Sequence, residues 1–172
     1  GSSVTNESLY LLQKFTRVGM GSNNIDFIAN HRSRLLDGLG RVIGLKGASG
    51  SYKDVVNSEA ILLVSSNITE EQNVAAVPVK RAVKAGVKLV VVDSREVEMT
   101  RYAEIWLRPN PGTETAVITA MLRVIADEAL ENHGFLNENC DDLTEYKNTL
   151  WAFDVKRVSK ISGVSEEDIR AG

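Results

Sequence analysis

Residues 59–71 read EAILLVSSNITEE and residues 88–96 read KLVVVDSRE, and these two stretches decide the fold. In each, a short apolar run stops at small, polar, hydrogen-bonding residues. The runs predict strands over 60–64 and 89–92, with a helix over 73–85 between them. Near-continuous apolar strands are typical of parallel sheets covered on both faces. The pattern predicts a strand–helix–strand unit that binds ligands at the carboxyl ends of its strands.

Further strands and helices extend this alternation. A short strand is predicted over 104–107, followed by a long helix that Gly134 should end. The predicted helices outside the strand–helix–strand unit are 5–18, 51–56, 95–102, 114–131, 143–151, 155–162 and one opening at Ser165. We therefore expect an α/β fold of the three-layer αβα type with a mostly parallel, Rossmann-like sheet. We expect residues 1–172 to form a single α/β domain excised from a larger subunit, with its C-terminal helix truncated.

Composition is that of a globular protein and excludes several classes of function. Of the 172 residues, 43% are hydrophobic. The 20 Lys and Arg are balanced by 23 Asp and Glu, which argues against a nucleic-acid surface. One cysteine, Cys140, and two distant histidines, His31 and His133, match no metal-ligand spacing. No apolar run approaches the roughly 20 residues that span a bilayer, so we expect no membrane insertion and a cytoplasmic location.

Three loops at the predicted sheet edge carry the candidate site. The first, 65–71, offers hydroxyls, an amide and backbone N–H groups at a helix start, which suit phosphate oxygens. In the second, Asp93 can accept hydrogen bonds from a ribose or a base edge, and Arg95 can pair a phosphate. The third, 111–114, opens the long helix, whose N–H groups favour anions, and Glu114 can accept the paired N–H donors of a guanine. Together the loops point to a nucleotide-like ligand.

Each loop also has a purely structural interpretation. Polar residues after a strand usually cap the next helix, Asp93 can cap the turn that contains Arg95, and Thr113 can be an N-cap. Both interpretations stay open, because all three loops lie on one sheet edge. The basic group at 31–34 is either a contact for an anionic cofactor or partner, or a solvated turn. No nucleophile–base–orienter set is visible, so no catalytic residue is predicted.

The two tryptophans, Trp106 and Trp151, are expected to pack in the core or against another domain rather than to stack on a ligand.

Several segments resemble, in order, those of molybdopterin oxidoreductases. TNESLYLLQKFTR (5–17) followed by GSNNID (21–26) resembles the family's TNE-x-N-Y-x-x-Q-K-F-x-R … GTNNID segment. The later matching segments are SSNITEE (65–71), KRAVKAGVKLVVVDSRE (80–96), RPNPGTETAVITAM (108–121) and ISGVSEEDIRA (161–171). The resemblance covers essentially the whole chain and includes formate dehydrogenase alpha subunits and the related G subunit of NADH dehydrogenase.

The resemblance implies the central α/β domain of a large catalytic subunit, inactive alone. Such domains bind the guanosine-dinucleotide arm of a molybdopterin guanine dinucleotide cofactor. The residues that it implies as contacts are Ser66, Asn67, Glu70, Glu71, Asp93, Arg95, Gly112, Thr113 and Glu114. It also implies an iron–sulfur cluster in the parent protein, and the other domains and subunits of that protein as partners. The location would be cytoplasmic, free or held at a membrane through a complex.

The chain also departs from the family pattern. Formate dehydrogenases place a cysteine or selenocysteine, then a histidine, shortly after NNID as the metal ligand. Here no cysteine follows Asp26 at that place, and Ser33 is a poor substitute for a thiolate on molybdenum. Ser65 stands where the family has a loop glycine, Ser94 where it has a proline, and Glu114 where it has an aspartate. The alternative is therefore a cofactor-free structural domain of a complex-I-like electron-transfer subunit.

Overall fold

The computed structural model describes residues 4–25, 38, 40–44, 49–141 and 143–172. The chain divides into two compact units, residues 1–51 and 52–172, which are described separately. The basic group at 31–34 and the stretch that follows Asp26 lie outside the described residues. The single domain over residues 1–172 stays a prediction.

In the first unit, helix α1 (Asn6–Lys14) continues into a π-helical turn over Phe15–Gly19. Thr5 caps α1, because its side-chain oxygen accepts a hydrogen bond from the Ser8 N–H at 3.4 Å. The chain leaves the turn through Gly21, which has a φ of +63° that a glycine adopts at little cost. The α-helix and the π-helical turn together agree with the helix predicted over 5–18.

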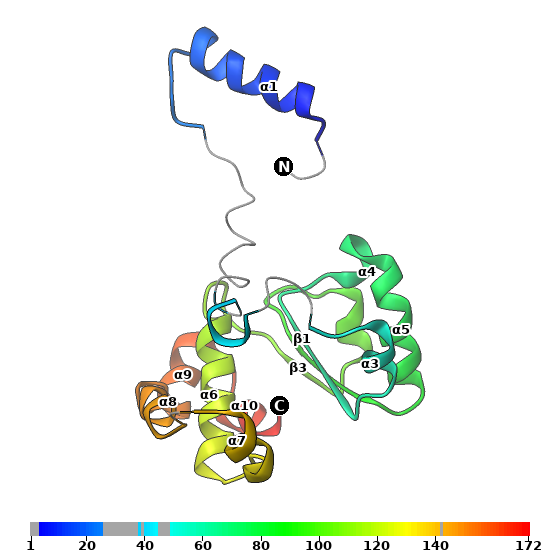
Figure 1. Cartoon of the computed structure of the whole chain (residues 1–172), viewed down its shortest axis with the longest axis vertical. Helices are drawn as coiled ribbons and strands as arrows, with labels where there is room; N and C mark the ends of the chain where they lie inside the picture. Colours follow the sequence, from blue (N-terminus) through cyan, green and yellow to red (C-terminus); the bar gives the residue numbers. More distant parts are fainter. Residues whose placement is uncertain (1–3, 26–37, 39, 45–48, 142) are drawn as a thin grey trace. The chain divides into compact units, whose positions relative to one another are not determined.

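In the second unit, three strands form a parallel sheet in the order β1-β2-β3 (Figure 1). The strands are β1 (Ala60–Val64), β2 (Lys88–Val92) and β3 (Ile105–Leu107). Val64 pairs with Val92, and Val92 pairs with Leu107, so the three strands end level with one another. The mixed α/β class and the parallel sheet are confirmed, and the chain is mostly helical. Rossmann-like three-layer organisation stays a prediction.

Helices precede, connect and follow these strands. They are α3 (Tyr52–Val56), α4 (Ile68–Glu71), α5 (Asn73–Lys84), the 3-10 helix η2 (Glu98–Tyr102), α6 (Glu114–Asp127), α7 (His133–Asn139), α8 (Leu143–Thr149), the 3-10 helix η3 (Leu150–Ala152), α9 (Val155–Ser162) and α10 (Glu166–Ala171). Ser165 caps α10, accepting from the Asp168 N–H at 3.0 Å, as its capping-box sequence predicts.

Two apolar clusters form because side chains alternate along each strand. Leu89 and Val91 of β2 pack with buried residues of α5 and η2. Val92 and Leu107 pack with buried residues of α6, α9 and α10. The central strand thus contributes to both clusters, which explains its near-continuous run of valines.

The long helix predicted over 114–131 is wrong at its C-terminal end. Helix α6 ends at Asp127, and Ala129 takes a φ of +53°, a left-handed conformation that breaks the helix. Gly134, expected to stop that helix, lies instead within α7. Asn132 caps α7 by accepting from the Phe135 N–H at 3.1 Å. A seven-residue helix shows too little periodicity to be separated from its neighbour in the sequence.

Trp106 and Trp151 behave differently. Trp106 packs against the α5–η2 cluster, as expected. Trp151 is 66% exposed, so it is not a core residue. The Arg123 guanidinium lies 3.9 Å from the centroid of the Trp151 ring, a cation–π contact that the sequence did not indicate.

Leu107→Ala should lower the free energy of unfolding by about 2–5 kcal/mol, because it opens a cavity in the α6–α9–α10 cluster. Leu107 is fully buried. Leu62→Ala is the matched control on β1, where the side chain is 47% exposed, and should cost less than about 1 kcal/mol. Urea denaturation measures both, and equal losses would contradict this placement of the core.

Candidate functional site

The strand register places the first two predicted loops side by side. The Ser65 N–H donates to the Val92 carbonyl at 2.8 Å, and the Asp93 N–H donates to the Leu107 carbonyl at 3.2 Å. Each strand is therefore held to its neighbour up to the residue where its loop begins. Ser66 and Asn67 leave β1 at the same edge where Asp93 leaves β2.

Ser65 has a backbone conformation that favours glycine. Its φ is +46°, in the left-handed region, where an L-residue is strained by about 1–2 kcal/mol. This is the position at which the family pattern has a glycine. The turn needs that conformation to leave β1, and Ser65 adopts it in spite of the strain.

The rest of the first loop opens helix α4. The Asn67 carbonyl accepts from the N–H groups of Glu70 and Glu71, at 3.1 and 2.9 Å. The Asn67 side chain does not cap the helix; its Oδ1 accepts from the Thr69 hydroxyl at 3.0 Å. Glu70 and Glu71 lie on α4 itself and are exposed. The side-chain cap offered as a structural interpretation is thus wrong for Asn67.

Asp93 is the most buried of the predicted site residues, with its side chain 3% exposed. Its Oδ1 accepts from the Arg95 N–H at 2.8 Å, which confirms the turn-capping interpretation for this oxygen. The Arg95 Nε lies 3.6 Å from the same oxygen, and the arginine side chain is 64% exposed. No described group donates to Oδ2, which is also buried. A buried polar atom without a partner costs about 1–3 kcal/mol.

Two residues that the sequence analysis missed brace this second loop. The Trp106 Nε1 donates to the Asp93 carbonyl at 2.9 Å, and the Arg108 Nε donates to the Ser94 carbonyl at 3.3 Å. The Arg108 guanidinium also lies 5.3 Å from the centroid of the Trp106 ring. Arg108 directly follows β3, so the strand-end rule that identified Asp93 also applies to it.

The third predicted loop begins α6. Gly112 has a φ of +88°, and nothing lies within 4 Å of the place where a Cβ would stand. Its N–H donates to Glu114 Oε2 at 2.9 Å. Thr113 occupies the N-cap position without a side-chain cap, because its hydroxyl donates to the Asn110 carbonyl at 2.7 Å. Glu114 therefore folds back on its own loop, while the backbone at Gly112 stays open to approach.

Asn110, also missed in the sequence analysis, anchors the third loop to α9. Its N–H donates to the Ser162 carbonyl at 2.7 Å, and its Nδ2 donates to the Ile161 carbonyl at 3.0 Å. Both partners lie about fifty residues further along the chain, so no local sequence signal could indicate them. The anchor fixes where α6 begins.

An ion pair connects the elements that follow the first two loops. The Lys80 Nζ of α5 lies 2.5 Å from Glu98 Oε1 of η2. This hydrogen bond holds the pKa of Glu98 below its ordinary value of 4.5, against partial desolvation, which raises it; Thr69 and Arg101 lower it further. Glu98 is therefore ionised at neutral pH and ties η2 to α5.

Within the part of the chain that the structure describes, no three His, Cys, Asp or Glu residues gather to hold a metal ion. The described helices include none long and apolar enough to cross a membrane.

The three loops at the sheet edge offer carboxylate acceptors, two arginines and a helix N-terminus. These groups suit a ligand with both hydrogen-bond donors and phosphates.

Residues 1–162 match the protein family described as "Molybdopterin oxidoreductase". The chain is 33% identical to "Putative formate dehydrogenase YrhE" of Bacillus subtilis (strain 168), over 170 residues. It is 34% identical to a protein of Staphylococcus aureus (strain USA300) that is also named a putative formate dehydrogenase. Both matches cover 98% of this chain but only 17% of the relative.

A solved structure, acetylene hydratase from Pelobacter acetylenicus, matches with a TM-score of 0.62 and 30% sequence identity. The match covers 66% of this chain and 16% of that chain.

Ser65→Gly should raise the free energy of unfolding by about 0.5–1 kcal/mol, because glycine adopts a φ of +46° without strain. Ser159→Gly, in the middle of α9, is the control and should lower it by about 0.5 kcal/mol, since glycine is a poor helix former. Urea denaturation of both variants checks the opposite signs. A loss at both positions would contradict the left-handed conformation at Ser65.

Lys80→Met should raise the pKa of Glu98 toward its ordinary value of 4.5, because it removes the hydrogen bond from Lys80 that is the main cause of the lowered pKa. A lowered folded-state pKa means that the ion pair stabilises the fold above pH 4.5 and loses this effect as the pH falls through the folded-state pKa. Carboxyl ¹³C NMR titration measures the shift. Lys88→Met is the control, because Lys88 pairs with Glu104; an equal shift of Glu98 there would refute the assignment.

Proposed function

The chain belongs to the molybdopterin oxidoreductase family, and we propose that it binds the guanosine-dinucleotide arm of a molybdopterin guanine dinucleotide cofactor. The observation that carries the proposal is Asp93, whose Oδ2 is buried at the sheet edge with no donor among the described residues. Such an atom fits a ligand that brings its own donor. In open parallel sheets, ligands bind at this edge.

In this proposal Asp93 accepts a hydrogen bond from a ribose hydroxyl or from the edge of the base. Because Oδ2 has almost no exposed surface, the second loop must open slightly to admit the ligand. Arg95 is the group that moves, since its side chain is mostly exposed and lies only 3.6 Å from the other carboxylate oxygen. Once moved, its guanidinium pairs a phosphate.

The first and third loops complete the proposed contacts. Glu114 accepts one of the paired N–H donors of guanine through Oε1, the carboxylate oxygen that Gly112 does not use, and the other through Oε2, which then accepts from both the guanine and the Gly112 N–H. Because nothing occupies the space beside Gly112, a phosphate can approach the first turn of the 14-residue helix α6 there, although the N–H groups of Gly112 and Thr113 already donate to Glu114 Oε2 and to the Asn110 carbonyl. Ser66 and Asn67 add polar contacts from the end of β1, with Glu70 and Glu71 on α4 beside them.

We also infer a Rossmann-like, three-layer arrangement for the sheet and its helices. The support is that β2 contributes side chains to two separate clusters, one with α5 and one with α6. A sheet buried on both faces leaves its strand ends as the accessible route for a nucleotide.

The cofactor supplies the redox chemistry when bound, and the residues of this chain bind and orient it. The chain spans 17% of the curated relatives it matches, so the activity of a whole protein is part of the proposal. We propose an oxidoreductase related to formate dehydrogenases, with an iron–sulfur cluster and the other cofactor contacts in further domains or subunits. Its location would be cytoplasmic, free or at a membrane through a complex.

A second candidate function is a cofactor-free structural domain of a complex-I-like electron-transfer subunit. The observation that favours it is the internal use of polar groups at the edge. Glu114 Oε2 binds the Gly112 N–H, and the Thr113 hydroxyl binds the Asn110 carbonyl. In this alternative, the loops are held closed by these bonds and bind no nucleotide.

Guanosine diphosphate should shift the amide NMR signals of all three loops, and Asp93→Asn should weaken its binding by about tenfold. The amide keeps an oxygen for the Arg95 N–H but presents a donor where Oδ2 stood, so one charge-assisted hydrogen bond is lost. Asp154→Asn is the matched control, because Asp154 also accepts a backbone N–H but caps the N-terminal end of α9, the end opposite to the residues that Asn110 contacts.

Adenosine diphosphate separates guanosine recognition from general phosphate binding. Equal affinity for both nucleotides would refute the guanine contact at Glu114. No shift in the three loops at millimolar guanosine diphosphate would reject the binding proposal in favour of the structural domain.

A further inference from the structure

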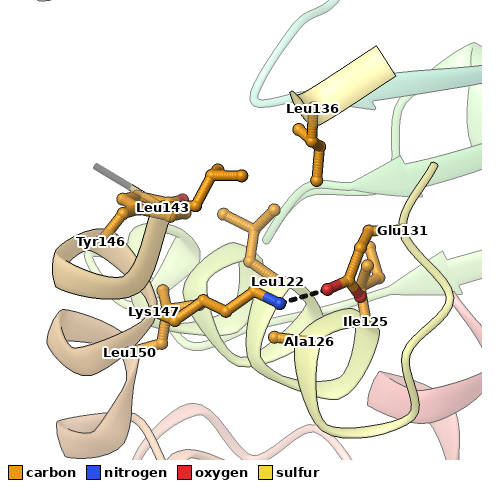
Figure 2. Close-up of a pocket in the computed structure, with 9 residues that line it drawn as sticks. All are labelled: Leu122, Ile125, Ala126, Glu131, Leu136, Leu143, Tyr146, Lys147 and Leu150. Atoms are coloured by element: carbon orange, nitrogen blue, oxygen red, sulfur yellow. Dashed lines mark hydrogen bonds and ion pairs between the residues drawn. The ribbon is translucent and has the colours of Figure 1, made fainter. Parts of the chain in front are cut away.

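A second candidate site lies between helices α6, α7 and α8, away from the carboxyl edge of the sheet. It is a pocket of about 220 Å³. Its walls are almost entirely apolar, and Figure 2 shows Leu122, Leu136 and Leu143 converging on the space beside an ion pair. Among the described residues that line it, the charged ones are the two members of that pair, Glu131 and Lys147.

Glu131 is the polar group that distinguishes this pocket from an ordinary packing defect. Its side chain is 8% exposed, and its Oε1 accepts from the Lys147 Nζ (Figure 2). Its Oε2 is buried, and no described group donates to it. The hydrogen bond from Lys147 lowers the pKa of Glu131, with help from a backbone hydrogen bond and from the charges of Lys147 and His133, against desolvation. The carboxylate is therefore ionised, with one oxygen paired and one unpaired.

We propose that this pocket binds a small, neutral, largely apolar molecule that carries one hydrogen-bond donor, such as a phenolic or aliphatic hydroxyl. The hydroxyl donates to Glu131 Oε2, which has almost no exposed surface, so the carboxylate must turn slightly toward the pocket to receive the ligand. The apolar body packs among Leu122, Leu136 and Leu143. This site differs from the proposed cofactor site in its position and in its ligand chemistry.

Charge balance selects a neutral ligand. Lys147 already neutralises Glu131, so the pair as a whole has no net charge. A cationic ligand would approach the Lys147 ammonium, and like charges repel. An anionic ligand would face the unpaired carboxylate oxygen. A neutral donor satisfies Oε2 without either repulsion, and a buried acceptor without a partner gains most from such a bond.

The size of the pocket fits a single aromatic ring with a small substituent. An apolar cavity of about 150 Å³ is large enough to hold benzene. A volume of about 220 Å³ therefore leaves room for a ring and a hydroxyl. Tyr146 lines the same space and offers its ring for an aromatic contact.

The test compares three probes of similar size in the 172-residue chain at pH 7. Phenol is neutral and has a donor, toluene is neutral and has none, and benzylamine is cationic. Methyl NMR should show phenol shifting the signals of Leu122, Leu136 and Leu143. Phenol should bind about tenfold more tightly than toluene, because it satisfies Oε2. Benzylamine should bind more weakly than phenol.

A cavity-filling variant provides the structural control. Ala126→Leu, on the pocket wall, should abolish phenol binding because the larger side chain occupies the space. Ala85→Leu makes the same change at an exposed position at the end of α5 and should leave phenol binding unchanged. Intermolecular NOEs from the phenol ring to the three leucine methyls locate the ligand in the unmodified chain, whether or not Ala126→Leu folds.

Three results would overturn the proposal. Equal affinity for phenol and toluene would remove the role of Glu131 Oε2. Phenol NOEs to residues outside the pocket, or phenol binding retained in folded Ala126→Leu, would place the ligand elsewhere. The absence of any shift with phenol at tens of millimolar would mean that the pocket binds no such ligand.

Discussion

The level ending of three parallel strands is the constraint on which the rest of the second unit depends. Val64, Val92 and Leu107 stand in register, and two backbone hydrogen bonds extend the pairing to the first loop residues, Ser65 and Asp93. Side-chain alternation then sends neighbouring residues of β2 into separate clusters with α5 and with α6. A one-residue slip of β2 would exchange its buried faces and move Asp93 away from the edge.

Many backbone groups and polar side chains at this edge make hydrogen bonds that hold the loops themselves in place. Asp93 uses one oxygen to hold the turn at Arg95 and leaves the other without a donor among the described residues. Glu114 uses one oxygen to hold Gly112. A structural role for one atom of a carboxylate does not compete with a binding role for the other. The two interpretations of these loops, as caps and as ligand contacts, can therefore be true of the same residue.

The sequence predicted features that are local or compositional. The apolar runs predicted the strands. The position of Asp93 directly after a strand predicted it as a site residue, and the structure places it at the carboxyl end of β2. The break at Ala129 was not predictable, because alanine ordinarily favours helix. The Trp106 bond to the Asp93 carbonyl and the Asn110 anchor to α9 also escaped prediction. Both join residues that are distant in sequence, and only the folded chain brings them together.

The Trp106 contact gives the chain an internal optical reporter. Its indole ring packs in the α5–η2 cluster while its Nε1 is bonded to the backbone of the second loop. The other tryptophan, Trp151, is largely exposed, and its ring makes a cation–π contact with the Arg123 guanidinium. An aqueous quencher such as acrylamide reaches Trp151 much more readily than Trp106. The unquenched emission and the indole N–H resonance of Trp106 thus report on the state of the Asp93 loop without any attached label.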